Sequence, residues 1–369
     1  MSRADPAPWR REPYRLLFPL GALLAWAGVL PWLFFALGAT ALYQPIFHSL
    51  GWRASFHPIA QVEGFLTCIA AAFLFTFLPR RTATAPAAGW QIALAVLAPL
   101  AAVGCAWLEK WAAAQVVWLL LLFVLVEFTL RRMRAAPPLQ PGFIWVGVGL
   151  LMGAAGAVLA AAGQGFDPGR FWIHLAGRGL LLQGLFTGLV LGTADLLATR
   201  HARSWWALAL HALGGAVFFA SFFVEQLVSL QLGFALRAVV TFFAAAPLQA
   251  ELTDLPGLQG SLARLSLWML PLGNLWVAVS PEHRRAGMHI VFLGCFAALA
   301  LAASTQVRAA PAVRPWRVAL AAGLLAVALV ARLLLDVDPP RFHLWLGTSA
   351  AAFLGATVPW AALTLSRRA

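Results

Sequence analysis

Charged residues are scarce in this chain. They make up 11% of its 369 residues, whereas a soluble globular protein has roughly 25%. Aspartate and glutamate together number only 13, while hydrophobic residues reach 62% and the mean hydropathy is +0.82. This balance excludes a soluble enzyme or carrier. It predicts an all-α polytopic membrane protein whose surroundings are the lipid bilayer.

Cysteine is also rare in this chain, and the common sequence motifs for catalysis are missing. The three cysteines, Cys68, Cys105 and Cys295, lie in apolar runs without metal-type spacing. They are interpreted as small buried side chains rather than as a disulfide framework. The chain lacks a phosphate-binding loop, a dinucleotide fingerprint, a Cys-x-x-Cys pair and a nucleophile elbow. Hydrolytic and nucleotide chemistry therefore have no support, and no catalytic residue is assigned.

Long apolar runs are what the chain has in abundance. Hydropathy predicts twelve transmembrane helices, at about residues 15–37, 57–79, 90–108, 111–130, 142–163, 171–197, 204–225, 229–250, 261–280, 287–307, 316–336 and 342–365. No loop between them is long enough for a separate domain. We therefore expect one transmembrane domain over residues 1–369, with residues 1–14 as a cytoplasmic N-terminal tail.

The formal net charge of +13 lies mostly in short loops. Seventeen basic residues fall on the side of the N-terminal tail, against six on the other side: Arg53, Lys110, Arg170, Arg284, Arg285 and Arg341. Basic loops stay in the cytoplasm, so both termini are expected there. A distribution over many short loops does not form a nucleic-acid-binding surface, and no nucleic-acid partner is expected.

Four histidines lie in the first residues of even-numbered spans: His57, His174, His289 and His343. Even-numbered spans begin at the outer face in this topology, so all four are expected at one depth near that face. The first three are separated by 117 residues (174 − 57) and 115 residues (289 − 174). This spacing suggests an internal repeat of three four-span units. Coincidence among the eight histidines is the alternative.

Small residues recur every four positions in the same four spans, as at Gly184, Gly188 and Gly192. Such rows let helix backbones approach closely. The histidine-bearing spans are therefore expected to form the inner bundle.

Glu63 lies six residues after His57, roughly 9 Å deeper in the membrane if the segment is helical. A charge at the centre of a membrane helix costs about 2.5–3.5 kcal/mol on insertion scales, and no cation lies at helical spacing within this span. Its partner is expected from another helix, with Arg178 and Arg237 as candidates. A protonated carboxyl group, or one that hydrogen-bonds a histidine ligand, are the alternatives.

The other polar residues of the spans each have two interpretations. His174 and Arg178 share a helix face, which suits either a haem (an axial nitrogen and a cation for a propionate) or a structural ion-pair site. His57 is either a ligand or an interfacial histidine bonded to loop backbone. His289, in a span without acids or bases, is interpreted as a ligand. His211 is interpreted as a hydrogen-bonded packing residue.

Two pairs of opposite charge are spaced four residues apart. Glu127 precedes Arg131, and Arg332 precedes Asp336. Such pairs usually give modest local support to a helix, so no further role is assigned to them.

Three segments resemble the NnrS family. EPYRLLFPLGALLAWAGVLPW resembles the family's first span, and GMHIVFLGCFAALALAASTQV resembles its tenth, with His289, Gly294, Thr305 and Val307 in register. The stretch from Phe56 resembles its second span, with matches at His57, Glu63-Gly64-Phe65, Phe73, Thr76 and Pro79. The span from Phe171 to Leu197, with His174 and Gln183-Gly184, is similar to the family but less specific.

The resemblance implies a haem- and copper-containing protein of the bacterial inner membrane, linked to nitric oxide metabolism and tolerance of nitrosative stress. The chain departs from the family pattern in two regions. Many members have a second histidine where this chain has Ile59, and an arginine followed by Gly-His-Thr-Gly where it has Gln306 and Arg308-Ala309-Ala310-Pro311. Both cofactors, a single metal centre and an apo scaffold are therefore the alternatives.

The sequence thus predicts a haem or copper site near the outer face that binds a diatomic such as nitric oxide. His57, His174, Arg178 and His289 are the expected cofactor-binding residues. The expected metal ligands are His57, Glu63, His289 and His343. Two other classes stay open. One is a transporter of a small solute or proton that uses Glu63, Arg178 and Arg237, and the other is an assembly partner in a respiratory complex.

The predicted orientation has a direct test. Green fluorescent protein fused after Ala369 is expected to fluoresce, because the C-terminus lies in the cytoplasm, whereas alkaline phosphatase at the same position is expected to be inactive. Active phosphatase with dark fluorescent protein would reverse the topology and place the four histidines at the inner face.

Overall fold

The computed structural model describes residues 8–38, 56–135, 141–163, 168–198, 204–255, 257–307 and 315–365. Within them the chain is all-α, with no strand. Twelve helical runs in this part are long and apolar enough to cross a membrane: Tyr14–Leu37, Phe56–Arg81, Gly89–Trp107, Trp111–Arg134, Gly142–Ala162, Phe171–Leu197, Trp205–Leu227, Leu230–Glu251, Gly257–Val279, Pro281–Thr305, Pro315–Val337 and Pro339–Leu363. The twelve predicted spans are confirmed.

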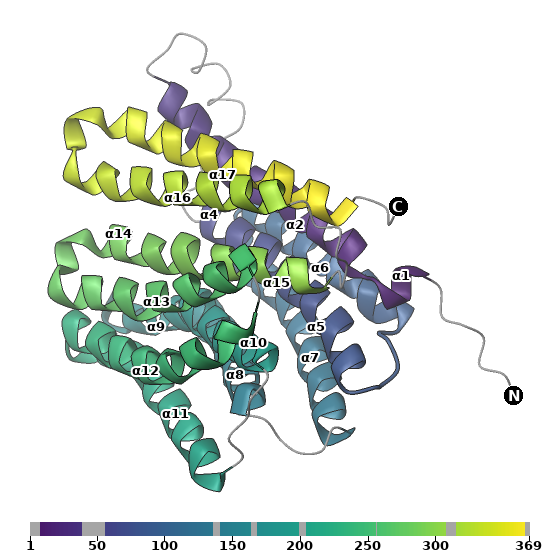
Figure 1. Cartoon of the computed structure of the whole chain (residues 1–369). Helices are drawn as coiled ribbons and strands as arrows, with labels where there is room; N and C mark the ends of the chain where they lie inside the picture. The colour runs from purple at the N-terminus through teal and green to yellow at the C-terminus, as the bar shows by residue number, and fades with distance from the viewer. Residues whose placement is uncertain are drawn as a thin grey trace, which may run out of the picture.

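Nine of the spans are single helices, besides the short α1 (Pro8–Arg11) at the start. They are α2 (Tyr14–Leu37), α6 (Gly89–Trp107), α7 (Trp111–Ala135), α8 (Pro141–Ala162), α11 (Trp205–Leu227), α12 (Leu230–Glu251), α13 (Gly257–Val279), α16 (Pro315–Val337) and α17 (Phe342–Leu365). In Figure 1, α1 and the C-terminal end of α17 lie on the same side of the bundle, as an even number of spans requires.

The second, sixth and tenth spans are each interrupted by a π-helical segment. They are built from α4 (Phe56–Ile59), η1 (Ala60–Leu66) and α5 (Thr67–Arg81); from α9 (Phe171–Gly179), η4 (Leu180–Gly184) and α10 (Leu185–Leu197); and from α14 (Arg284–His289), η7 (Ile290–Ala297) and α15 (Ala298–Val307). π-Helix is rare and occurs frequently at functional sites. Short 3₁₀ segments connect other elements: η3 (Pro168–Arg170), η5 (Leu252–Asp254), η6 (Pro281–His283) and η8 (Pro339–Arg341).

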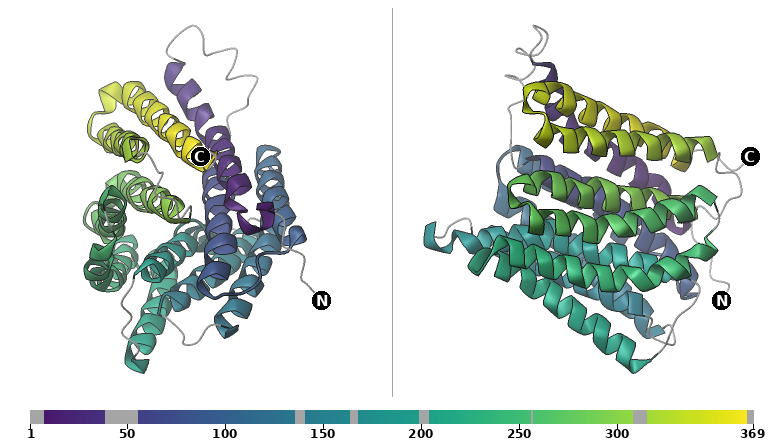
Figure 2. Two further views of the ribbon diagram at one scale, coloured as in Figure 1. Left: turned by 45° about the vertical axis from the view of Figure 1, so that its right-hand side comes forward. Right: turned by 60° about the vertical axis from the view of Figure 1, so that its left-hand side comes forward.

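The helices follow one another around the bundle in three units of four spans: residues 14–135, 141–251 and 257–365. The fourth span of each unit packs on the first span of the next, α7 on α8 and α12 on α13. The ring then closes, because α17 packs on α2, as Figure 2 shows where the yellow end of the chain returns beside its purple start. This cyclic order supports the threefold repeat.

Glycines at equivalent positions fix the same register in all three units. The first spans carry Gly28, Gly156 and Gly273, where an added Cβ would come within 3 Å of Gln61, Leu181 and Val291 respectively. The second spans of the units carry Gly64, Gly184 and Gly294, each against one side chain from the first span and one from the third span of its own unit. The π segments also begin at matching positions, four residues before each of these three glycines.

The histidines do not share this register. His57 lies three residues before its π segment, His174 six before and His289 one before. Their near-equal spacing is therefore not the mark of the repeat, which the glycines and the π segments carry instead.

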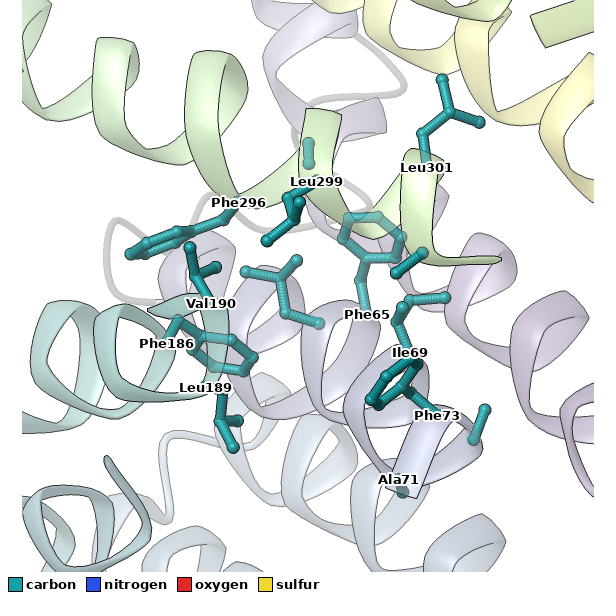
Figure 3. Close-up of a cluster of buried hydrophobic side chains, with 14 of the residues drawn as sticks. Phe65, Ile69, Ala71, Phe73, Phe186, Leu189, Val190, Phe296, Leu299 and Leu301 are labelled. Atoms are coloured by element: carbon teal, nitrogen blue, oxygen red, sulfur yellow. The ribbon is translucent and has the colours of Figure 1, made fainter. Parts of the chain in front are cut away.

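The second, sixth and tenth spans form the centre of the bundle. They are the three most buried spans in the described part, at 89%, 83% and 67% of their apolar windows. Figure 3 shows their side chains meeting, with Phe65, Ile69 and Phe73 opposite Phe186, Leu189 and Val190, and with Phe296 and Leu299 beside them. These apolar side chains bring the three helices together, and they also line a small cavity of about 60 Å³ between them.

Close packing predicts which glycines tolerate a methyl group. In Gly156→Ala the new Cβ would lie 2.5 Å from the backbone nitrogen of Leu181 and 2.8 Å from the carbonyl oxygen of Gly177. Backbone atoms cannot swing away, so we expect this variant to lose about 1–3 kcal/mol of stability. Gly323→Ala meets nothing within 4 Å and is expected to be neutral or stabilised by up to about 1 kcal/mol. Thermal unfolding in detergent measures both, and equal melting temperatures would contradict the packing of α8 against η4.

Candidate functional site

One cavity lies at the end of the bundle at which the even-numbered spans begin, the end predicted to face outward. It measures about 230 Å³ and lies between the third unit and the first. We call it the histidine cavity, because His57 and His289 both line it. Its lining is mainly apolar: Val29, Trp32, Pro58, Val62, Phe65, Leu66, Leu182, Phe292, Leu293, Ala297, Leu346, Ala350 and Phe353, with Gln61, Arg332 and Ser349 as the further polar members.

His57 enters this cavity from the start of the second span. Pro58, next to it, suits the first turn of a helix because it has no backbone N–H to satisfy. The Nδ1 atom of His57 donates a hydrogen bond to the carbonyl oxygen of Gly28 at 2.9 Å, since a carbonyl only accepts. The ring also meets Trp32 edge to face, with centroids 5.8 Å apart. The imidazole is therefore oriented, and in its neutral form Nε2 carries a lone pair.

His289 is oriented in the same way at the end of α14. Its Nδ1 donates to the carbonyl oxygen of Arg285 at 2.7 Å. Its Nε2 accepts a hydrogen bond from Nε of Arg332 at 3.1 Å. Arg332 was predicted to pair with Asp336, but its hydrogen bond goes to this histidine, while Asp336 accepts from the backbone nitrogen of Ala286 at 3.2 Å. Sequence reasoning missed this contact, which joins residues 43 positions apart.

A second, smaller cavity of about 70 Å³ separates the first unit from the second. We call it the arginine cavity; its lining is Pro58, Ile59, Trp111, Gln115, Ala160, His174, Arg178, Leu181 and Leu182. His174 donates from Nδ1 to the carbonyl oxygen of Ala160 at 2.7 Å and stacks on Phe171. The predicted pairing of His174 with Arg178 on one helix face is thus present, but in a different cavity from His57 and His289. Only Pro58 and Leu182 line both cavities.

Glu63 is fully buried and lines neither of these cavities. Its Oε1 accepts a hydrogen bond from Nε2 of Gln115 at 2.6 Å. Its Oε2 has no hydrogen-bond partner among the described residues, and neither has Oε1 of Gln115. Gln115 was not predicted as a partner of Glu63. Its position, as a single amide four residues into an apolar span, is the sequence feature that could have indicated this role.

His343 stands apart from the other histidines. Its side chain is exposed and contacts the rings of Phe35 and Phe342, with centroids 5.6 and 5.4 Å away. It lines neither cavity. In the described part of the chain no three His, Cys, Asp or Glu side chains form a group that could hold a metal ion. Of the four predicted metal ligands, the structure brings together His57 and His289.

The remaining interface, between the second unit and the third, holds a network of polar side chains. Glu225 pairs with both Arg237 and Arg284, at 2.5 Å for the latter. Arg237 also donates to Oε1 of Gln183 at 2.6 Å, and Gln183 donates to Oδ1 of Asn274 at 2.7 Å. Arg237 packs against the faces of two phenylalanine rings as well. This network satisfies a fully buried guanidinium, which would otherwise be costly.

The residues of the transporter alternative do not form one polar path in the described part. Glu63 bonds to Gln115, Arg178 lines the arginine cavity, and Arg237 belongs to the network around Glu225. His211 accepts a hydrogen bond from Trp145 at 2.8 Å. This contact agrees with its interpretation as a hydrogen-bonded packing residue. The predicted pair of Glu127 and Arg131 is confirmed.

Comparison with known proteins agrees with the fold and with the resemblance. No curated protein matches the chain. The family model described as NnrS protein matches residues 8–367, which is nearly the whole length. The match includes all twelve spans and both cavities. This multi-pass membrane protein therefore belongs to the NnrS family.

Proposed function

We propose that the protein binds haem or copper in the histidine cavity and, through that group, nitric oxide. Membership of the NnrS family supports a role in the response to nitric oxide. The observation that carries the finer proposal is the convergence of His57 and His289 on one apolar cavity, from spans more than 230 residues apart (289 − 57). The site would serve nitric oxide metabolism or tolerance of nitrosative stress in the bacterial cytoplasmic membrane.

The residues of the cavity fit such a group. Both histidines give their Nδ1 hydrogen to a carbonyl oxygen, the arrangement that orients metal-binding imidazoles. Neutral imidazole suits both copper and haem iron. Two such nitrogens fit a metal whose other positions are taken by a porphyrin or by an exogenous ligand. His289 would have to release Arg332, whose hydrogen bond now occupies its Nε2.

The chain's own residues supply the surroundings of the site. When bound, the metal supplies an open coordination position for a diatomic ligand. Thirteen of the lining residues are apolar and exclude water from that position, while Arg332 places hydrogen-bond donors at its edge. Nitric oxide is small and apolar enough to enter from lipid, so the site needs no aqueous gate.

Variants of three histidines test the proposal. His57→Ala and His289→Ala are each expected to lose most of the bound haem or copper, because each removes one of the two imidazoles that line the cavity. His343→Ala is the matched control and is expected to keep the wild-type content, since that ring lies outside the cavity. The measurement is an absorption spectrum with metal analysis on protein expressed with haem and copper both supplied.

Several outcomes would contradict the site. Wild-type protein with neither a Soret band nor copper would refute it. So would a loss in His343→Ala equal to that in His57→Ala. A Soret band without copper identifies haem, and copper without a Soret band identifies the metal alone. Gel-filtration profiles check that each variant is folded.

A further inference from the structure

Arg178 has no counter-charge in the described part of the chain. It lies about 10 Å along the sixth span from Phe171, by the helical rise, and its side chain is half-buried. No described carboxylate lies within ion-pair distance of its guanidinium, and none of the nine residues around the arginine cavity is acidic. An arginine inside a membrane span is costly unless something compensates its charge.

The interface between the second unit and the third shows how this fold neutralises the charge of a buried arginine. Between the second unit and the third, Arg237 and Arg284 share the carboxylate of Glu225, so a counter-charge is supplied there by the chain itself. Between the first unit and the second, Arg178 is also buried in part, but it lies beside the arginine cavity and not beside a carboxylate. Glu63 does not fill that place, because it lines no cavity and its Oε1 is bonded to Gln115.

We propose that the arginine cavity binds a small monovalent inorganic anion, a halide or a nitrogen oxoanion. The guanidinium of Arg178 would supply the charge, with N–H groups in a planar fork that suits an oxoanion. Gln115 has a second amide hydrogen beyond the one given to Glu63, and the indole N–H of Trp111 is a further donor in the lining. Neither the guanidinium of Arg178 nor the indole of Trp111 makes a hydrogen bond to a residue of the described part.

The size of the cavity selects the ligand class. Its volume of about 70 Å³ exceeds the roughly 30 Å³ that a water molecule occupies in the liquid. It therefore admits an anion of one to four atoms, and it is much smaller than the histidine cavity at about 230 Å³. His174 closes one side, held by its hydrogen bond to Ala160.

Anion titrations on purified full-length protein without cofactor test the proposal. Nitrite, nitrate and chloride are each titrated at constant ionic strength, balanced with gluconate, which is too large for the cavity. Melting temperature and isothermal calorimetry are the two readouts. A ligand that binds only the folded state raises the melting temperature with its concentration. We expect saturable binding of at least one of the three anions.

The variants separate this site from nonspecific charge effects. Arg178→Gln is expected to lower the affinity at least tenfold, and Arg178→Lys, which keeps the charge, to lower it less. Arg170→Gln is the matched control, because it removes the same charge from an exposed position at the same end of the same span. It is expected to bind like wild type. Bromide in crystals, located by anomalous scattering, is expected beside Arg178.

The proposal does not depend on the histidine cavity. His289→Ala is expected to keep anion binding even if it loses haem or copper, so the two sites fail or succeed separately. Wild-type melting that is independent of all three anions would overturn the inference. An equal response in wild type and Arg178→Gln would also overturn it, because the anion would then bind elsewhere.

Discussion

The close approach of helix backbones inside each four-span unit is the constraint on which this structure depends. Lipid gives helices no hydrophobic reason to associate, so packing must hold them together. At Gly28, Gly156 and Gly273 the first span of each unit comes so near the next span that no Cβ fits without a shift. These contacts place the three π-containing spans at the centre. The cavities follow from that placement, since they open where the units meet.

The three interfaces between units are formed by equivalent helices, but the side chains within them differ. One holds an ion-pair network around Glu225, one holds His174 and Arg178 around a small cavity, and one holds His57 and His289 around a larger cavity. The fourth residue of the π segment shows the same divergence: it is Glu63 in the first unit, Gln183 in the second and Leu293 in the third. A repeated scaffold has thus been used for three different chemical environments.

The sequence predicted the spans well because hydropathy is a local property of about 20 residues. It also placed the histidines at one end of the bundle, since a position near the start of a span fixes depth. Depth does not fix direction around the helix axis. His343 therefore shares the depth of His57 but is exposed beside Phe35, and His174 faces a different interface.

The contacts that define the sites could not be read from local patterns. Glu63 and Gln115 are 52 residues apart, and Arg332 and His289 are 43 apart. Each pairing depends on how separate helices are rotated, which only the packing decides. Asp336 lies at helical spacing from Arg332 and was the expected partner, whereas no local pattern indicated the hydrogen bond of Arg332 to His289.

The closure of the ring by α17 against α2 has a consequence for biosynthesis. The histidine cavity lies at this seam, where the last-made helices meet the first. A ribosome delivers His57 early, but the wall that contains His289, Arg332 and Leu346 emerges only after most of the polypeptide has entered the membrane. The pocket is therefore completed last, and a half-finished chain cannot enclose a ligand there.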